Sequence, residues 1–160
     1  MDQSKKNSLR LTALTLALIS FVFMMTLDYF KINVILFGSF SFNFMEIAFG
    51  GTVKVMGEDR QVFTASVVNI IAVVFSGLSV LSLIYTVLNK NYREDRGTAK
   101  FTIVFLVVAA FIVMFSENFI VKANPDANYN ISTEGAVVLT FLTLLGSAFC
   151  MLLVHMSEKA

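Results

Sequence analysis

Residues 64–89 read TASVVNIIAVVFSGLSVLSLIYTVLN, and this stretch contains no charged side chain. A second uncharged stretch, residues 135–154, reads GAVVLTFLTLLGSAFCMLLV. A helix needs about 20 apolar residues to cross a hydrocarbon core about 30 Å thick, so either stretch is long enough to span a membrane. Helices are the expected form because a segment in lipid must satisfy its own backbone hydrogen bonds.

Two shorter uncharged stretches, residues 11–27 and 101–116, reach the same length if they extend past an acid at the end of the span, Asp28 in the first and Glu117 in the second. We therefore predict an all-α membrane protein, a single integral domain built on a four-transmembrane-helix bundle. The predicted helices cover about residues 11–30, 66–89, 101–121 and 135–155.

The composition supports this class. Hydrophobic residues make up 57% of the 160 residues and charged residues 14%, whereas a soluble domain carries about 25% charged residues. We therefore expect the excess hydrophobic side chains to contact the lipid bilayer. A net charge of +1, with 12 Lys and Arg against 11 Asp and Glu, argues against a nucleic-acid partner. The single cysteine, Cys150, cannot form an intrachain disulfide.

Orientation follows from the distribution of Lys and Arg, which concentrate in cytoplasmic segments. With the N-terminus inside, eight of these residues lie in inner segments and four in outer segments. The inner set is Lys5, Lys6, Arg10, Lys90, Arg93, Arg96, Lys100 and Lys159, and the outer set is Lys31, Lys54, Arg60 and Lys122. We predict a multi-pass protein of the plasma membrane with both termini in the cytoplasm.

The first outer loop, about residues 31–65, is much longer than a turn requires. Phenylalanines at 40, 42 and 44 alternate with polar residues, and residues 52–55 alternate again after Gly50-Gly51. This pattern predicts a small extracellular β-hairpin at about residues 38–56. Residues 45–49 suit a helical turn equally well, so the register stays open. The predicted interaction platform of this loop consists of Phe40, Phe42, Phe44, Phe49 and Lys54.

Polar residues within membrane spans are costly and mark candidate sites. Four of them fall near the outer leaflet: Asp28, Asn69, Glu117 and Asn118. One hypothesis is an outward-facing cleft in which the two acids bind a cation or begin a proton path. The alternative, which we favour, is that these acids lie in water at the interface or pair with nearby Lys or Arg.

Small residues recur in two of the predicted spans, at Ser76-Gly77, Ser79 and Ser82 and at Gly146-Ser147-Ala148. Small side chains let helix backbones approach closely, so these residues predict helix–helix contact faces. His155 has only Glu158 nearby as a further ligand and is expected to be an interfacial histidine. The sequence predicts no catalytic, cofactor-binding or metal-binding residue.

The layout resembles two groups of proteins. The long first outer loop with strand character, together with both termini inside, resembles the claudin-type tetraspan topology. The chain lacks the tryptophan motif and the cysteine pair of the claudin loop, so claudin functions are not implied. The Phe49-Gly50-Gly51 element after a strand-like segment is similar to one in small four-helix membrane proteins of low-GC Gram-positive bacteria. That resemblance implies no activity.

These features predict a non-enzymatic membrane accessory or interaction protein that presents its outer loop to a membrane-protein partner or to copies of itself. The alternative is a small transporter or channel that uses the outer-leaflet polar residues. A membrane enzyme is the third possibility, but no set of residues in the sequence supports it.

Overall fold

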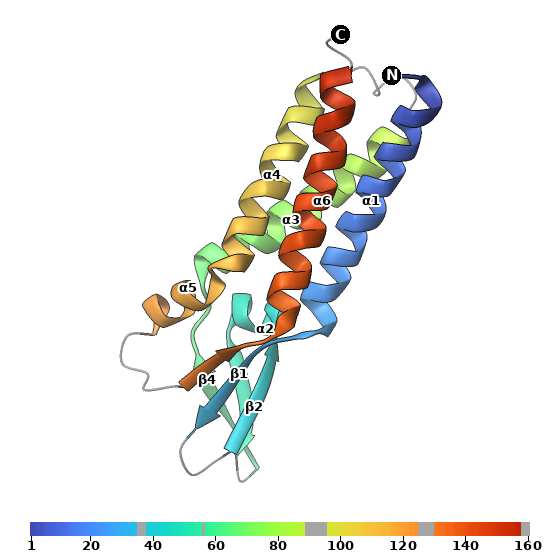
Figure 1. The fold of residues 1–160 in the computed structure, drawn as a ribbon. Coiled ribbons are helices and arrows are strands. Elements are labelled where there is room, and N and C mark those ends of the chain that lie inside the picture. Colours follow the sequence, from blue (N-terminus) through green and yellow to red (C-terminus); the bar gives the residue numbers. More distant parts are fainter. Residues whose placement is uncertain (35–37, 56, 89–95, 125–129, 158–160) are drawn as a thin grey trace.

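In a computed structural model of the chain, four long helices lie side by side (Figure 1). The structure describes residues 1–34, 38–55, 57–88, 96–124 and 130–157. Within these ranges the long helices are α1 (Gln3–Thr26), α3 (Val67–Leu88), α4 (Arg96–Met114) and α6 (Gly135–Ser157). Each is long and apolar enough to cross a membrane, which confirms the four apolar helices predicted from the sequence. The N-terminal end of α1 and the C-terminal end of α6 lie together at one end of the bundle, and the described strands lie at the other end.

Small and hydroxyl-bearing residues pack the helices together, as predicted. Ser147 of α6 donates a 2.8 Å hydrogen bond to the carbonyl oxygen of Ala13 in α1. Ser82 of α3 lies 2.7 Å from the hydroxyl of Thr102 in α4. A Cβ added to Gly146 would lie 3.2 Å from a methyl group of Leu16, so the backbones of α1 and α6 approach closely there. These contacts join α1 to α6 and α3 to α4.

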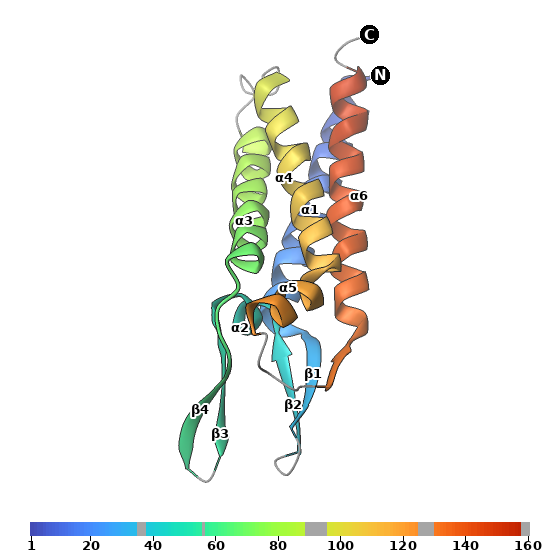
Figure 2. The ribbon, with the colours of Figure 1, turned by 90° about the vertical axis from the view of Figure 1, so that its left-hand side faces the viewer.

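The strands at the other end form two antiparallel sheets. The larger sheet has the order β2-β1-β5. The smaller is a hairpin of two strands, β3 and β4, whose tip lies apart from the larger sheet in Figure 2. The bounds are β1 Asp28–Val34, β2 Gly38–Asn43, β3 Gly51–Val55, β4 Glu58–Phe63 and β5 Asn130–Thr133. The helices between them are α2, Phe44–Phe49, and α5, Ser116–Ala123.

The predicted hairpin at residues 38–56 is wrong. Residues 38–43 pair with β1 instead, with Phe42 opposite Phe30, while β3 pairs with β4. The reason is the helix α2 between the two alternating runs. Asn43 accepts a hydrogen bond from the backbone N–H of Glu46, whose carboxylate accepts from the backbone N–H of Asn43. This reciprocal capping box starts a helix where the sequence pattern left a helical turn as the alternative.

The first and third helices end earlier than predicted. Helix α1 ends at Thr26, and the chain continues as strand β1, where an irregularity in the β1–β2 pairing between Asp28 and Phe30 accompanies the burial of both Tyr29 and Phe30. Helix α4 ends at Met114, and α5 follows in a different direction (Figure 2). Both helices end early because the residues that follow them pack at the end of the bundle that carries the two sheets, which we call the sheet end. Helices α3 and α6 have nearly the predicted bounds.

Candidate functional site

Two of the predicted platform residues form the buried base of the sheet end. Phe42 and Phe44 are 2% and 0% exposed. The Phe42 ring packs edge-on against Phe63 of β4, with ring centroids 4.8 Å apart. The Phe44 ring lies 5.2 Å from that of Tyr29. These contacts join β2 to β4 and α2 to β1, and neither phenylalanine is available as a contact surface.

Gly51 is the point at which the two sheets meet. A Cβ added there would lie 2.5 Å from Cζ of Phe63 and 2.9 Å from Cε1 of Phe42, distances too short for real contacts. Only glycine allows both rings to approach the β3 backbone this closely. The two sheets are consequently fixed to each other at their bases.

Tyr29 joins the sheet end to helix α6. Its hydroxyl group hydrogen-bonds the hydroxyl of Thr140, and its carbonyl oxygen accepts a 2.8 Å hydrogen bond from the backbone N–H of Glu134. The side chain is fully buried. Burial raises the pKa of the phenol well above its ordinary value of 10, because the buried site disfavours the charged phenolate.

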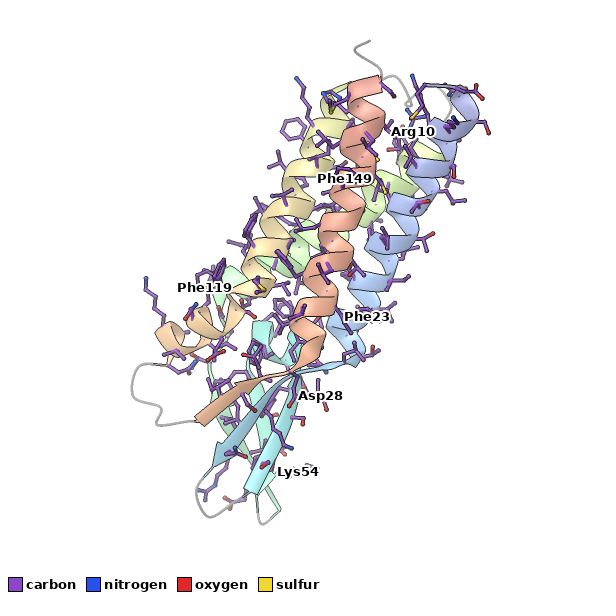
Figure 3. The ribbon with its side chains drawn as sticks, viewed as in Figure 1. Arg10, Phe23, Asp28, Lys54, Phe119 and Phe149 are labelled. Carbon is purple, nitrogen blue, oxygen red and sulfur yellow. The ribbon has the colours of Figure 1, made fainter. Side chains whose placement is uncertain are left out.

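The other three predicted platform residues are at least partly accessible. Phe49 of α2 is 56% exposed, Lys54 of β3 is exposed, and Phe40 of β2 is half-buried. They come from three different elements. Lys54 lies away from the helices on the β3–β4 hairpin, as Figure 3 shows.

The accessible feature of this end is strand edges rather than a phenylalanine face. Strand β2 is an outer strand of its sheet, and its sequence, GSFSFN, carries no charge. Strand β4 differs, since its exposed part contains Glu58, Asp59 and Arg60. Arg60 and Glu58 form an exposed ion pair with N···O 3.6 Å. Charged edges resist pairing with another chain, so β2 is better suited than β4 to accept a further strand.

The structure does not bring the four predicted outer-leaflet polar residues together. Asp28 and Asn118 are exposed, and Glu117 accepts a hydrogen bond from the hydroxyl of Thr133. Asn69 is 0% exposed within the bundle. Within the described ranges no hydrogen bond or ion pair joins any two of the four. Within the same ranges Arg60 forms its ion pair with Glu58 and not with Asp28 or Glu117.

Helix α3 carries a buried polar stripe of Asn69, which the sequence predicted as a polar candidate site residue, and Ser76, which it predicted only as a small contact residue. Asn69 and Ser76 are both 0% exposed. The two amide atoms of Asn69 and the hydroxyl of Ser76 have no hydrogen-bond partner in the part of the chain that the structure describes. The two residues lie seven positions apart, about two helical turns. A buried polar group without a partner costs free energy, so the stripe is a candidate position for a bound polar molecule.

The opposite end of the bundle also buries polar side chains. Arg10 is 3% exposed, and His155, two residues before the end of α6, is 6% exposed. A signal for Arg10 does exist in the sequence. The buried residues of α1 recur at helical spacing, and extending that spacing toward the N-terminus reaches Arg10: Arg10, Ala13, Ala17, Ser20 and Met24.

No metal centre is found among the described residues, because no group of three or more His, Cys, Asp or Glu side chains could hold an ion there. Residues 89–95, which were predicted to form a cytoplasmic loop, and Lys159 lie outside the described residues, as do the side chains of Arg96 and Asn130. No family model, curated protein or solved structure matches the chain.

Proposed function

We propose that the protein is a multi-pass membrane protein whose four long helices cross the plasma membrane, with both termini in the cytoplasm and the sheets outside. The apolar surface of the bundle supports this proposal. Large apolar side chains are at least half exposed on every long helix, an arrangement that water disfavours and lipid accommodates. Examples are Leu11 (56%), Leu81 (64%), Phe101 (65%) and Phe149 (59%). The excess of Lys and Arg at the terminus end supports the orientation.

Within this frame the protein acts as a non-enzymatic accessory protein that binds an extended segment of a membrane-protein partner along strand β2. The observation that carries this proposal is the uncharged β2 edge, held on a base that is fixed at Gly51 and Tyr29. Addition of a strand to an open sheet edge supplies backbone hydrogen bonds, and pockets for alternate side chains supply specificity. The half-buried Phe40 lies on this strand and would contribute such apolar contact.

Site-specific photocrosslinking in native membranes tests this function. A photoreactive side chain at Ser39 of β2 is expected to give a discrete adduct, whereas the same group at Lys122, exposed on α5, is expected to give none. Ser41→Glu adds a charge to the edge opposite Lys31, its cross-strand neighbour, and so preserves the β1–β2 pair while disfavouring a further strand. We expect this substitution to abolish the Ser39 adduct, and Thr52→Glu on β3 to leave it unchanged.

Equal adducts from Ser39 and Lys122, or a Ser39 adduct that survives Ser41→Glu, would exclude strand addition at β2. Coexpression of two differently tagged copies identifies the partner. An adduct that carries both tags shows that the bound segment belongs to a second copy of this chain.

A second candidate function is the passage of a small polar solute, and the buried stripe of Asn69 and Ser76 supports it. Polar side chains that face the interior of a membrane bundle often mark a transport path. Reconstitution in liposomes tests this alternative. Flux that is lost in Asn69→Leu, and retained in Asn118→Leu at an exposed position, would favour transport, and absence of flux in the native protein would remove it.

A further inference from the structure

A small cavity lies between α1 and α3 at the end of the bundle that carries the termini. Its volume is about 170 Å³, and the described residues that line it are Asn7, Arg10, Leu11 and Val87. Figure 3 shows Arg10 at this end, opposite the end that carries Asp28 and Lys54. In the proposed orientation the cavity lies at the cytoplasmic boundary of the membrane, where the uncharged part of α1 begins.

The cavity presents a cation and a hydrogen-bond acceptor side by side. The Arg10 side chain is 3% exposed, so its charge acts in a medium of low dielectric, where attraction to an anion is stronger than in water. The guanidinium group also matches the geometry of phosphate oxygens. Oδ1 of Asn7, one helical turn away, is buried and has no hydrogen-bond partner among the described residues. That oxygen suits a hydroxyl or ammonium donor placed next to the anion.

The cavity also borders the lipid-facing surface. Leu11, one of its lining residues, is 56% exposed, and Leu88, the neighbour of Val87, is 78% exposed. Along α1, Leu18 and Val22 continue the face of Leu11 at helical spacing and are 41% and 51% exposed. A molecule with its polar group in the cavity could therefore lay an apolar chain along this face of the helix.

We propose that this cavity binds the headgroup of an anionic phospholipid of the cytoplasmic leaflet, with Arg10 contacting the phosphate and Asn7 accepting a hydrogen bond from a headgroup hydroxyl. The assignment rests on the proposed membrane orientation. A phospholipid headgroup and free phosphate both carry the phosphate group that Arg10 would contact. Two features favour the lipid, namely the acceptor oxygen of Asn7 beside Arg10 and the exposed apolar face of α1 that begins at Leu11. Basic pockets between helices on the cytoplasmic side of membranes are known positions for anionic headgroups.

The absence of tryptophan from the chain makes a direct test possible. Leu11→Trp places a single fluorophore at the rim of the cavity, and Phe101→Trp places one at an exposed position near the terminus end of α4 as a control. Each variant is reconstituted in phosphatidylcholine vesicles containing a minor fraction of brominated phosphatidylglycerol or brominated phosphatidylcholine. Bromine quenches tryptophan on contact, so the difference between the two brominated lipids reports selective binding.

At Leu11→Trp we expect brominated phosphatidylglycerol to quench with a relative association constant about fivefold that of brominated phosphatidylcholine, the factor typical of one basic residue at an anionic surface. At Phe101→Trp we expect the two lipids to quench equally. Arg10→Gln in the Leu11→Trp background is expected to remove the selectivity. The comparison of the two lipids at Leu11→Trp is made with Arg10 in place, so the test does not depend on whether the Arg10→Gln variant folds.

Equal quenching by the two lipids at Leu11→Trp would overturn the proposal. Equal quenching by the two lipids, together with a change in the fluorescence of Leu11→Trp on addition of inorganic phosphate, would assign the cavity to free phosphate instead of a lipid. Failure of both brominated lipids to quench at Phe101→Trp would show that the helices do not face lipid, and the proposed function would then fail together with this site. Quenching at Phe101 without selectivity at Leu11 would reject the site alone.

Discussion

Replacement of Gly51 by alanine should separate the two sheets. The added Cβ would lie 2.5 and 2.8 Å from two ring atoms of Phe63 and 2.9 Å from Cε1 of Phe42. Both rings belong to nearly fully buried residues, so neither can move aside without disturbing the base of the sheet end. Overpacking of a well-packed site costs about 1–3 kcal/mol. Because the added Cβ would contact two rings at once, we expect Gly51→Ala to destabilise the packing of the two sheets by about 2 kcal/mol. The opening equilibrium of the sheet end should therefore shift about thirtyfold.

Native-state proteolysis in mild detergent measures this shift. Trypsin cuts after Lys54 and Arg60 only when the hairpin opens far enough to enter the protease, so the cutting rate follows the opening equilibrium. We expect Gly51→Ala to raise that rate about thirtyfold. Gly135→Ala serves as the matched control, because an added Cβ there meets no atom within 4 Å.

A double-mutant cycle identifies the contact responsible. Phe63→Leu removes the ring atoms nearest the added Cβ, so Gly51→Ala should cost at least about 1 kcal/mol less in that background. An unchanged cutting rate in Gly51→Ala would refute the close approach of the sheets at Gly51. A full penalty in the Phe63→Leu background would show that the cost does not come from the Phe63 ring.

Three further substitutions test other parts of the structure. Asn69→Leu should stabilise the bundle by roughly 1–2 kcal/mol, measured as a rise in Tm, because it removes a buried amide that has no described partner. A fall in Tm would instead show that the amide holds a bound molecule. Tyr29→Phe removes the hydrogen bond to Thr140 and should cost about 1 kcal/mol at neutral pH. Since burial raises the pKa of this phenol above 10, the unfolded chain releases its proton first as the pH rises through about 10. The native protein should lose stability there, and a pH series of unfolding should show that Tyr29→Phe lacks this loss. Gly146→Val should overpack against Leu16, lower the free energy of unfolding by about 1–3 kcal/mol and so lower Tm. Leu16→Ala should relieve part of that cost. A neutral Gly146→Val would argue against close packing of α1 and α6.

Local patterns predicted part of the sheet end and missed the rest. The alternation around Phe40 correctly indicated a strand, because side-chain alternation is a property of a single strand. Its pairing was wrong, because pairing depends on which other strand is nearby. The β1 segment, Asp28–Val34, was assigned partly to a helix and partly to a loop, yet it pairs with both β2 and β5. Strand β5 comes from residues 130–133, and no local signal links two segments so far apart in the sequence.

Candidate residues divide in the same way. Asn69 was identified because a polar residue in an apolar stretch is visible in the sequence, and the structure places it inside the bundle. Phe42 and Phe44 were identified as a contact surface, but whether an apolar strand face is buried depends on the elements that cover it. Here Tyr29 and Phe63 provide that cover. Arg10 was counted only for its charge, although its helical spacing with Ala13 and Ala17 already indicated the buried face of α1.

The sequence by itself determined that the chain forms four long apolar helices and that small residues lie between them. A helix satisfies its backbone hydrogen bonds within one segment, so length and apolarity are sufficient to predict it. Only the tertiary structure decided which strands pair, where Gly51 brings two rings together, and that Arg10 borders a cavity between α1 and α3. Each of these depends on neighbours that are distant in sequence, because strand pairing, close packing and burial are properties of two or more segments at once.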